Sequence, residues 1–130
     1  MNFRYARHTN NLKPLVEFYT QIIGLEKLGE FKDHSNYNGV FLGIQKLNWH
    51  IEFTESNENA NHKSDEDDLL VFYLESEDEF DQLKLKIKNK GISIKRSKNP
   101  YWNENGIEIT DPDGFGLILT KKNKTAHNKS

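Results

Sequence analysis

The chain has 130 residues and a formal net charge of −2 at pH 7, so its length predicts one compact domain and its charge provides no basic field for nucleic acid. It contains no cysteine, which excludes disulfides, thiolate nucleophiles and cysteine-ligated zinc. The N-terminus has no apolar signal region, and no apolar run approaches the ~20 residues of a membrane span, so we expect a cytoplasmic protein without membrane contact.

The first half of the sequence predicts a strand, a helix and three further strands. Residues 3–9 alternate in polarity and indicate a half-buried strand. Asn10 and Asn11 can cap a helix whose apolar residues follow helical spacing up to Gly24, the expected C-terminal glycine. Strands are then expected at 25–31, 40–44 and 48–55, with a loop rich in turn formers at 34–39.

Residues 56–68 are polar throughout and predict a mobile linker. Their acidic run, 65–68, lacks the regular ligand spacing, the internal glycine and the closing glutamate of a calcium loop. We therefore interpret this run as a solvated acidic segment.

The second half repeats the first. A strand at 69–74 precedes a capping-box pattern, Ser76 to Glu79, and a helix expected to end before Gly91. A short strand is predicted at 92–95, and Tyr101 and Trp102 are expected in a loop.

A β-hairpin is predicted over 106–119, with its turn at the Asp-Pro-Asp-Gly sequence 111–114. The chain thus reads as an α+β protein of two modules, about 3–55 and 69–120, within a single domain spanning 1–130. The polar tail, 121–130, is expected to fray.

These patterns resemble the vicinal oxygen chelate superfamily, which includes glyoxalases, bleomycin-resistance and fosfomycin-resistance proteins and extradiol dioxygenases. The residues that carry the resemblance are Asn11-Leu12, Val16 to Tyr19, Gly24-Leu25, His50 to Thr54 and Asp111 to Gly114. Two further phrases, Glu30 to His34 and Asn99 to Trp102, resemble an uncharacterised glyoxalase-like branch, which brings no known reaction.

The resemblance implies two βαβββ modules that form an open, barrel-like cleft, and a homodimer. In catalytic members of the superfamily, side chains on the concave face hold a divalent metal ion that acts as a Lewis acid on the substrate. The resemblance also indicates where the metal ligands would stand in this sequence.

Of four expected ligand positions, this chain keeps one. The first falls on Arg4, whose guanidinium has no lone pair for a metal. The second falls on Glu52, a suitable carboxylate. The third falls on Leu69 or Leu70 and the fourth on Ile118 or Leu119, which are all aliphatic.

We therefore expect Glu52 to pair with Arg4 and the usual metal site to be absent. A non-standard divalent metal site stays open as an alternative, with His50 and Glu52 as ligands and His8 or His34 as a possible third. His50, Glu52 and Glu108 are also the candidate catalytic groups.

The residues predicted to line a ligand site are polar or aromatic: Arg4, His8, His50, Glu52, Tyr37, Tyr73, Tyr101 and Trp102. The sequence favours a small-molecule binding protein similar in mode to bleomycin-resistance proteins, with no metal cofactor. The alternatives are a metal-dependent glyoxalase-type lyase using His50 and Glu52, and a fold used for protein–protein association.

Overall fold

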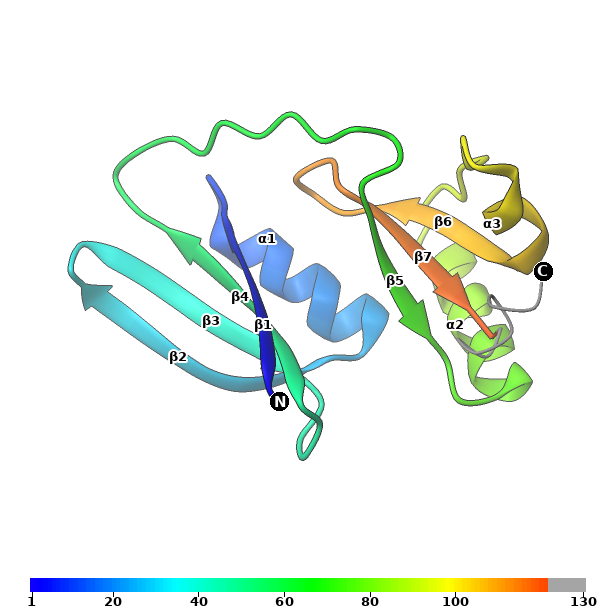
Figure 1. Ribbon diagram of the computed structural model, residues 1–130, viewed down its shortest axis with the longest axis horizontal. Coiled ribbons are helices and arrows are strands. Elements are labelled where there is room, and N and C mark those ends of the chain that lie inside the picture. The colour runs from blue at the N-terminus through cyan, green and yellow to red at the C-terminus, as the bar shows by residue number, and fades with distance from the viewer. Residues whose placement is uncertain (122–130) are drawn as a thin grey trace. The chain divides into compact units, whose positions relative to one another are not determined.

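In the computed structural model, which describes residues 1–121, the chain divides into two compact units, Met1–His62 and Lys63–Ser130. Figure 1 shows the helices and strands of each unit. The predicted fraying of the tail from residue 122 onward lies outside the described residues. No helix in the described part of the chain is long and apolar enough to cross a bilayer.

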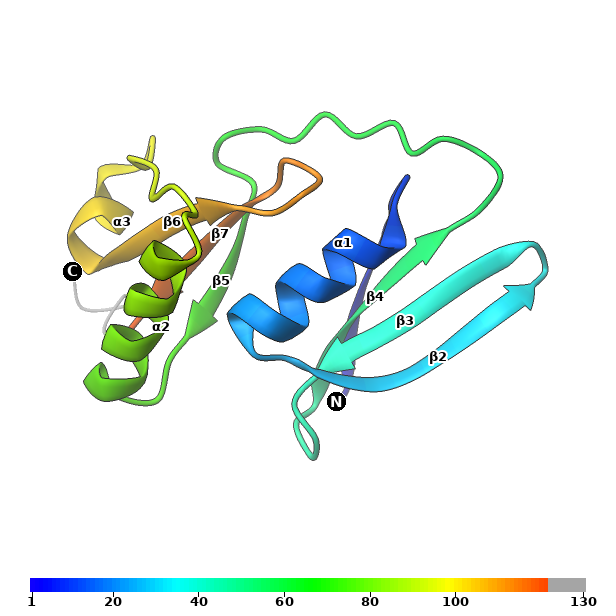
Figure 2. The ribbon, with the colours of Figure 1, turned by 180° about the vertical axis from the view of Figure 1, so that it is seen from behind.

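The first unit is a four-stranded sheet with one helical segment. Its elements are β1 (Phe3–His8), α1 (Leu12–Glu17), the π-helix η1 (Phe18–Ile23), β2 (Glu26–His34), β3 (Tyr37–Gly43) and β4 (Trp49–Glu55). The strand order is β1-β4-β3-β2, in which β1 is parallel to β4 and the other neighbours are antiparallel. Figure 2 shows α1 and η1 lying across one face of this sheet.

The predicted single helix is an α-helix followed by π-helical turns. Its apolar side chains Leu15, Tyr19 and Ile22 are buried, and the ring of Tyr19 lies 5.1 Å from that of Phe53. Gly24 ends the segment at φ 93°, as predicted from its position.

The cap predicted from Asn10 and Asn11 is wrong in its chemistry. Asn11 occupies the N-cap position without a side-chain hydrogen bond. The amide of Leu12 instead donates to Oε2 of Glu55 at 3.0 Å, so a carboxylate from the last strand satisfies the helix N-terminus.

The loop predicted at 34–39 is also wrong, because β2 continues to His34 and β3 begins at Tyr37. Ser35 and Asn36 make the connection with positive φ values of 52° and 72°. The hairpin needs only these turn residues, so the remaining polar positions are free to join the strands.

The second unit has a three-stranded sheet with the order β5-β7-β6. Its elements are β5 (Leu69–Tyr73), α2 (Glu77–Asn89), α3 (Pro100–Asn105), β6 (Gly106–Thr110) and β7 (Gly116–Thr120). β5 is parallel to β7, and β6 is antiparallel to it. Figure 2 shows α2 lying across one face of this sheet.

The predicted start and end of α2 are confirmed. Ser76 is the N-cap, and its hydroxyl accepts from the amide of Glu79 at 3.1 Å. The helix ends at Asn89, before Gly91, which has φ 73°.

The closing hairpin is confirmed as well. In its turn, Oδ1 of Asp111 accepts from the amides of Asp113 at 2.8 Å and Phe115 at 3.1 Å. Gly114 takes φ 90°, the conformation for which glycine is suited.

Two predictions between α2 and β6 are wrong. Residues 92–95 make a single bridge, Lys95 to Glu108, instead of a strand. Tyr101 and Trp102 lie in α3 instead of a loop, because Asn99 caps that helix with its side chain and Pro100 occupies the first turn.

The linker 56–68 has almost no regular secondary structure, as predicted, but its first part is hydrogen-bonded to the first unit. The amide of Ala60 donates to Oδ1 of Asn10 at 2.7 Å, and Nδ2 of Asn10 donates to the carbonyl oxygen of Ala60 at 3.4 Å. A ring nitrogen of His62 is also hydrogen-bonded to the carbonyl oxygen of His8.

Candidate functional site

The face of the first sheet opposite α1, here called the helix-free face, carries the polar residues that the sequence singled out. Side chains alternate between the two faces along each strand. The buried face includes Ile51 and Phe53, so the helix-free face receives their neighbours in β4. Across the paired strands, this face comprises Arg4, Ala6, His8, Phe31, Gly39, Phe41, Gly43, His50, Glu52 and Thr54.

Arg4 contacts two acceptors from β4. Its Nε donates to Nε2 of His50 at 2.8 Å, and its Nη1 donates to Oε1 of Glu52 at 3.3 Å. The predicted pairing of Arg4 with Glu52 is therefore present. Because Arg4 can only donate, the contact assigns the imidazole proton of His50 to Nδ1.

An aromatic ring lies beneath this polar cluster. The Arg4 guanidinium carbon is 4.9 Å from the centroid of the Phe41 ring, within the range of a cation–π contact. The His50 ring meets Phe41 edge-on at 5.7 Å, and Phe31 follows on the other side at 5.8 Å. The result is an apolar floor bordered by one cation.

Small residues leave room for this arrangement. Ala6 is the partner of Glu52 across the strands, and its short side chain offers the carboxylate no hydrogen bond in competition with Arg4. The Phe31 ring lies over Gly39, where an added Cβ would come within 2.3 Å of it. Any larger residue at that position would displace the ring.

Phe31 and Phe41 were not among the residues predicted to line a ligand site. The signal that could have found them is the alternation of Gly39, Phe41 and Gly43 in β3, which places one ring between two bare positions on a single face.

His8 and Tyr37 lie together at the far end of this face from Arg4. A ring nitrogen of His8 is 3.0 Å from the hydroxyl of Ser56, and the His8 and Tyr37 rings meet edge-on at 6.1 Å. Four residues of strand separate His8 from Arg4, which corresponds to roughly 13 Å. His8 therefore does not join the cluster of Arg4, His50 and Glu52.

The second sheet has no equivalent of that cluster. Its register places Leu69, Gly116 and Ile118 where the first sheet has Arg4, His50 and Glu52. By this correspondence, the third expected ligand position falls on Leu69 instead of Leu70, and the fourth falls on Ile118 instead of Leu119.

Glu108, the third candidate catalytic residue, is a buried carboxylate in the second unit. Only 2% of it is exposed. Its Oε1 accepts from the Ser97 hydroxyl at 2.7 Å, and its Oε2 lies 3.7 Å from Nζ of Lys95. The adjoining cavity of about 100 Å³ is too small for an organic ligand, since such sites are usually ~300 Å³ or larger.

The remaining predicted aromatic residues also lie in the second unit. Tyr73 ends β5 and is exposed. Tyr101 and Trp102 pack edge-on at 4.9 Å in α3.

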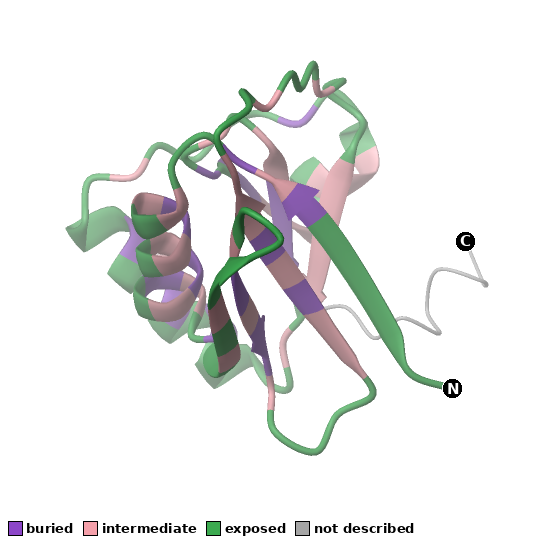
Figure 3. Cartoon of the chain, turned by 90° about the vertical axis from the view of Figure 1, so that its left-hand side faces the viewer, coloured by how far each residue is buried: buried purple, intermediate pink, exposed green. Residues whose placement is uncertain are grey.

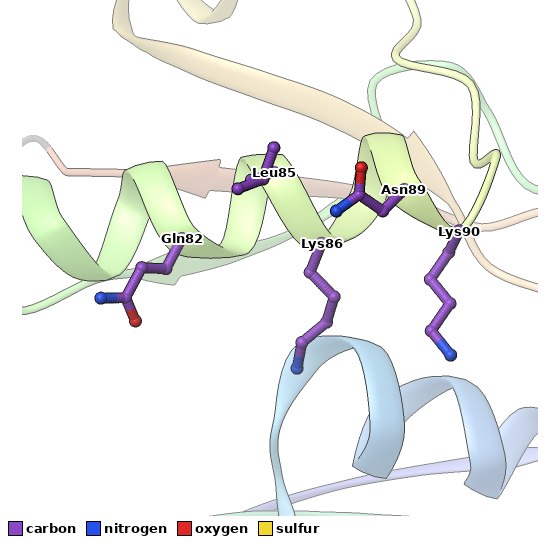
Figure 4. Close-up of a pocket in the computed structure, with 5 residues that line it drawn as sticks. All are labelled: Gln82, Leu85, Lys86, Asn89 and Lys90. Atoms are coloured by element: carbon purple, nitrogen blue, oxygen red, sulfur yellow. The ribbon is translucent and has the colours of Figure 1, made fainter.

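A hollow of about 470 Å³ lies along α2 in the same unit. Gln82, Lys86 and Lys90 point the same way, and Leu85 and Asn89 complete the lining (Figure 4). It gathers no carboxylate, imidazole or hydroxyl group.

The residues at the expected metal positions do not fit a divalent cation. Arg4 places a permanent positive charge there. Its hydrogen bonds engage Nε2 of His50 and Oε1 of Glu52, the atoms that would otherwise coordinate the metal. Among residues 1–121, no three His, Asp or Glu side chains come together in a group that could hold a metal ion.

The sequence matches two domain families in tandem. Residues 3–54 match the YycE-like N-terminal domain, and residues 67–121 match the YycE-like C-terminal domain. An uncharacterised protein YycE of Bacillus subtilis strain 168 is 36% identical over 120 residues, which cover 89% of this chain and 84% of that protein. This chain belongs to the YycE-like family.

The crystal structure of a Bacillus subtilis YycE protein of unknown function agrees with this assignment. It superposes with a TM-score of 0.85 at 33% identity, covering 94% of this chain and 90% of that one. The predicted resemblance to an uncharacterised glyoxalase-like branch is confirmed.

More distant solved structures show the same fold. Glyoxalase I of Leishmania major matches with a TM-score of 0.72 at 21% identity, covering 97% of this YycE-like chain and 88% of its own. TnmS3, an antibiotic-binding protein from Streptomyces sp. CB03234, matches with a TM-score of 0.65 at 13% identity, covering 92% and 93%. The predicted α+β fold of paired glyoxalase-type modules is confirmed.

Proposed function

We propose that this YycE-like protein binds a small organic molecule on the helix-free face of its first sheet without a divalent cation. The observation that carries the proposal is the pair of hydrogen bonds from Arg4 to His50 and Glu52. The guanidinium supplies at this position the positive charge that a metal ion supplies in catalytic members of the superfamily.

The surroundings of Arg4 support a ligand site. The Arg4 side chain is 51% exposed, although it is held by two contacts and lies over the Phe41 ring. Fixed donors beside an apolar floor are the usual composition of a small-molecule site. The antibiotic-binding protein TnmS3 has the same fold, which supports a binding role by analogy.

The experiment is a metal-content measurement on protein purified without chelator, followed by thermal melts with Ni²⁺, Mn²⁺, Zn²⁺ and Mg²⁺ salts. A cation at ~100 times its dissociation constant would stabilise the fold by ~2.7 kcal/mol. We expect no stoichiometric metal and no such shift. A co-purifying metal that is lost in Glu52→Ala would favour the alternative, a metal-dependent lyase that uses His50 and Glu52.

A further inference from the structure

The inference concerns the chemical class of the ligand and rests on the proposed function. We infer that the ligand is a flat organic carboxylate whose acid group binds the outer edge of Arg4 and whose ring lies on Phe41 and Phe31.

Arg4 uses only part of its hydrogen-bonding capacity. A guanidinium has five N–H donors, of which one goes to His50 and one to Glu52. The described part of the chain places no acceptor against Nη2. A ligand group bound there must therefore accept hydrogen bonds, and a carboxylate offers two coplanar oxygens that match the fork of Nη1 and Nη2.

The orientation of Arg4 is fixed before the ligand arrives. His50 and Glu52 hold the guanidinium through two of its three nitrogens, and the centroid of the Phe41 ring lies 4.9 Å from its central carbon. Fewer side-chain rotamers are then lost on binding, which is the advantage of a preorganised site. The plane of the guanidinium also sets the plane in which the ligand carboxylate must lie.

The floor beside Arg4 favours a flat ring. Phe41 and Phe31 lie 5.8 Å apart with their planes 48° to one another, and both are partly exposed. Gly39 keeps Phe31 low against the sheet, since no side chain lifts the ring. Aromatic faces of this kind stabilise a conjugated ring more than a puckered aliphatic one of similar size.

The extent of the face sets the size of the ligand. Arg4 marks one end and the pair of His8 and Tyr37 marks the other, roughly 13 Å away along the strand. A carboxylate on a one- or two-ring system fits within that length. Longer molecules would reach the hydroxyl of Tyr37, which could confer further selectivity.

The test uses three commercial probes: 2-naphthoate, the uncharged 2-naphthamide, and cyclohexanecarboxylate. Each is titrated into the full chain while amide chemical shifts and heats of binding are recorded. We expect 2-naphthoate to bind at least about tenfold more tightly than either other probe, because a charge-assisted pair and a ring contact each contribute on that scale. The shifts should be centred on Arg4, Phe41 and Glu52.

Two variants and one matched control identify the site. Arg4→Lys keeps the charge but removes the fork, and should weaken 2-naphthoate about tenfold or more. Phe41→Leu keeps an apolar side chain but removes the ring face, and should abolish the preference for 2-naphthoate over cyclohexanecarboxylate. Arg96→Lys, at an exposed position of the second unit, should leave binding unchanged.

Equal affinity for 2-naphthoate and 2-naphthamide, or unchanged binding in Arg4→Lys, overturns the inference. Binding of 2-naphthamide alone on this face, with shifts at Phe41 and Glu52, also overturns it but leaves the proposed metal-free binding in place. Metal-dependent stabilisation that is lost in Glu52→Ala overturns the proposed function itself, so the two failures are distinguishable.

Discussion

Arg4, His50 and Glu52 meet because of strand pairing and not because of sequence proximity. Arg4 and His50 are direct partners across β1 and β4, and Glu52 is the next residue of β4 on the same face. A histidine in place of Arg4 would stand beside two natural metal ligands, at the spacing of side chains directly opposite each other in a sheet.

We therefore predict that Arg4→His acquires a metal site. Ni²⁺ should raise the melting temperature of Arg4→His and leave that of the natural protein unchanged, because three ligands would then converge on one point. Arg96→His, in the second unit, is the matched control and should show no shift. An Arg4→His protein that is indifferent to Ni²⁺ would show that these side chains do not converge as the structure indicates.

Ser97 supports the buried carboxylate of Glu108. Its hydroxyl donates to Oε1 at 2.7 Å, and Ser97 is itself only 5% exposed. Ser97→Ala removes the donor and leaves a buried acceptor unsatisfied, so the free energy of unfolding should fall by about 1–3 kcal/mol. Chemical denaturation measures the change.

The control for this prediction is Ser93→Ala, because Ser93 is exposed in the same connection between α2 and α3. Its free energy of unfolding should stay within about 0.5 kcal/mol of the natural protein. Equal effects at Ser93 and Ser97 would mean that the bond to Glu108 contributes nothing specific.

At the scale of elements, α2 is stabilised at its N-terminus by two separate devices. Ser76 caps the first turn, and Glu77 in that turn forms an ion pair of 2.6 Å with Lys121, just beyond β7. Hydrogen bonding and charge from Lys121 lower the pKa of Glu77 below its ordinary value.

We predict that Lys121→Met raises the pKa of Glu77 back toward that ordinary value, which an NMR titration of the side-chain carboxyl can follow. Because the pKa is depressed in the folded protein, the contribution of the pair is present above the unfolded-state pKa and is lost as the pH falls through the folded-state value. Lys13→Met, on α1 of the first unit, should leave the Glu77 titration unchanged. An unaltered Glu77 pKa in Lys121→Met would show that the pair does not persist in solution.

The same elements show how far the sequence could predict the structure. The caps, terminal glycines and Asp-Pro-Asp-Gly turn act locally, so their chemistry could be read from neighbouring residues. The contact of Glu55 with the N-terminus of α1 could not be predicted in this way, because that carboxylate comes from a distant strand. Residues 92–95 alternate like a strand, yet only Lys95 pairs, and propensity alone does not reveal which residues find a partner.

The candidate site was predictable in part for the same reason. The pairing of Arg4 with Glu52 follows from which residues occupy the expected ligand positions, and the structure contains it. The aromatic floor was missed because Phe31 and Phe41 reach the helix-free face only through the register of β2 against β3. That register shifts twice, between Lys27 and Gly29 and between Phe31 and His34, and a sequence pattern of period two does not predict such shifts.

At the scale of the whole molecule, three strands of each unit follow the same order and directions, but the two sheets differ in the side chains that they present. The first carries a charged group beside partly exposed rings, whereas the positions of the second that correspond to Arg4, His50 and Glu52 are Leu69, Gly116 and Ile118. The first strand is exposed from Phe3 to Ala6, as the burial colours of Figure 3 show. An unpaired strand edge of this kind is available for association.

The resemblance to glyoxalase-type proteins leads us to predict a homodimer of 15.2 kDa chains. Sedimentation at micromolar concentration should give a mass near twice that of one chain. Phe3→Lys, which places a charge on the exposed edge strand, is expected to shift the equilibrium toward the monomer if β1 takes part. A monomeric natural protein would contradict the prediction.

The most direct test of the account is a titration of the full chain with Mn²⁺, a paramagnetic ion, while the amide signals of Arg4, His50 and Glu52 are recorded. If the Arg4 guanidinium occupies the metal position, a stoichiometric amount of Mn²⁺ should broaden these three signals no more than those of exposed acidic residues such as Asp67. Selective broadening at His50 and Glu52 would show that the ion displaces Arg4, and would contradict the claim that the Arg4 guanidinium takes the place of a metal ion on the helix-free face.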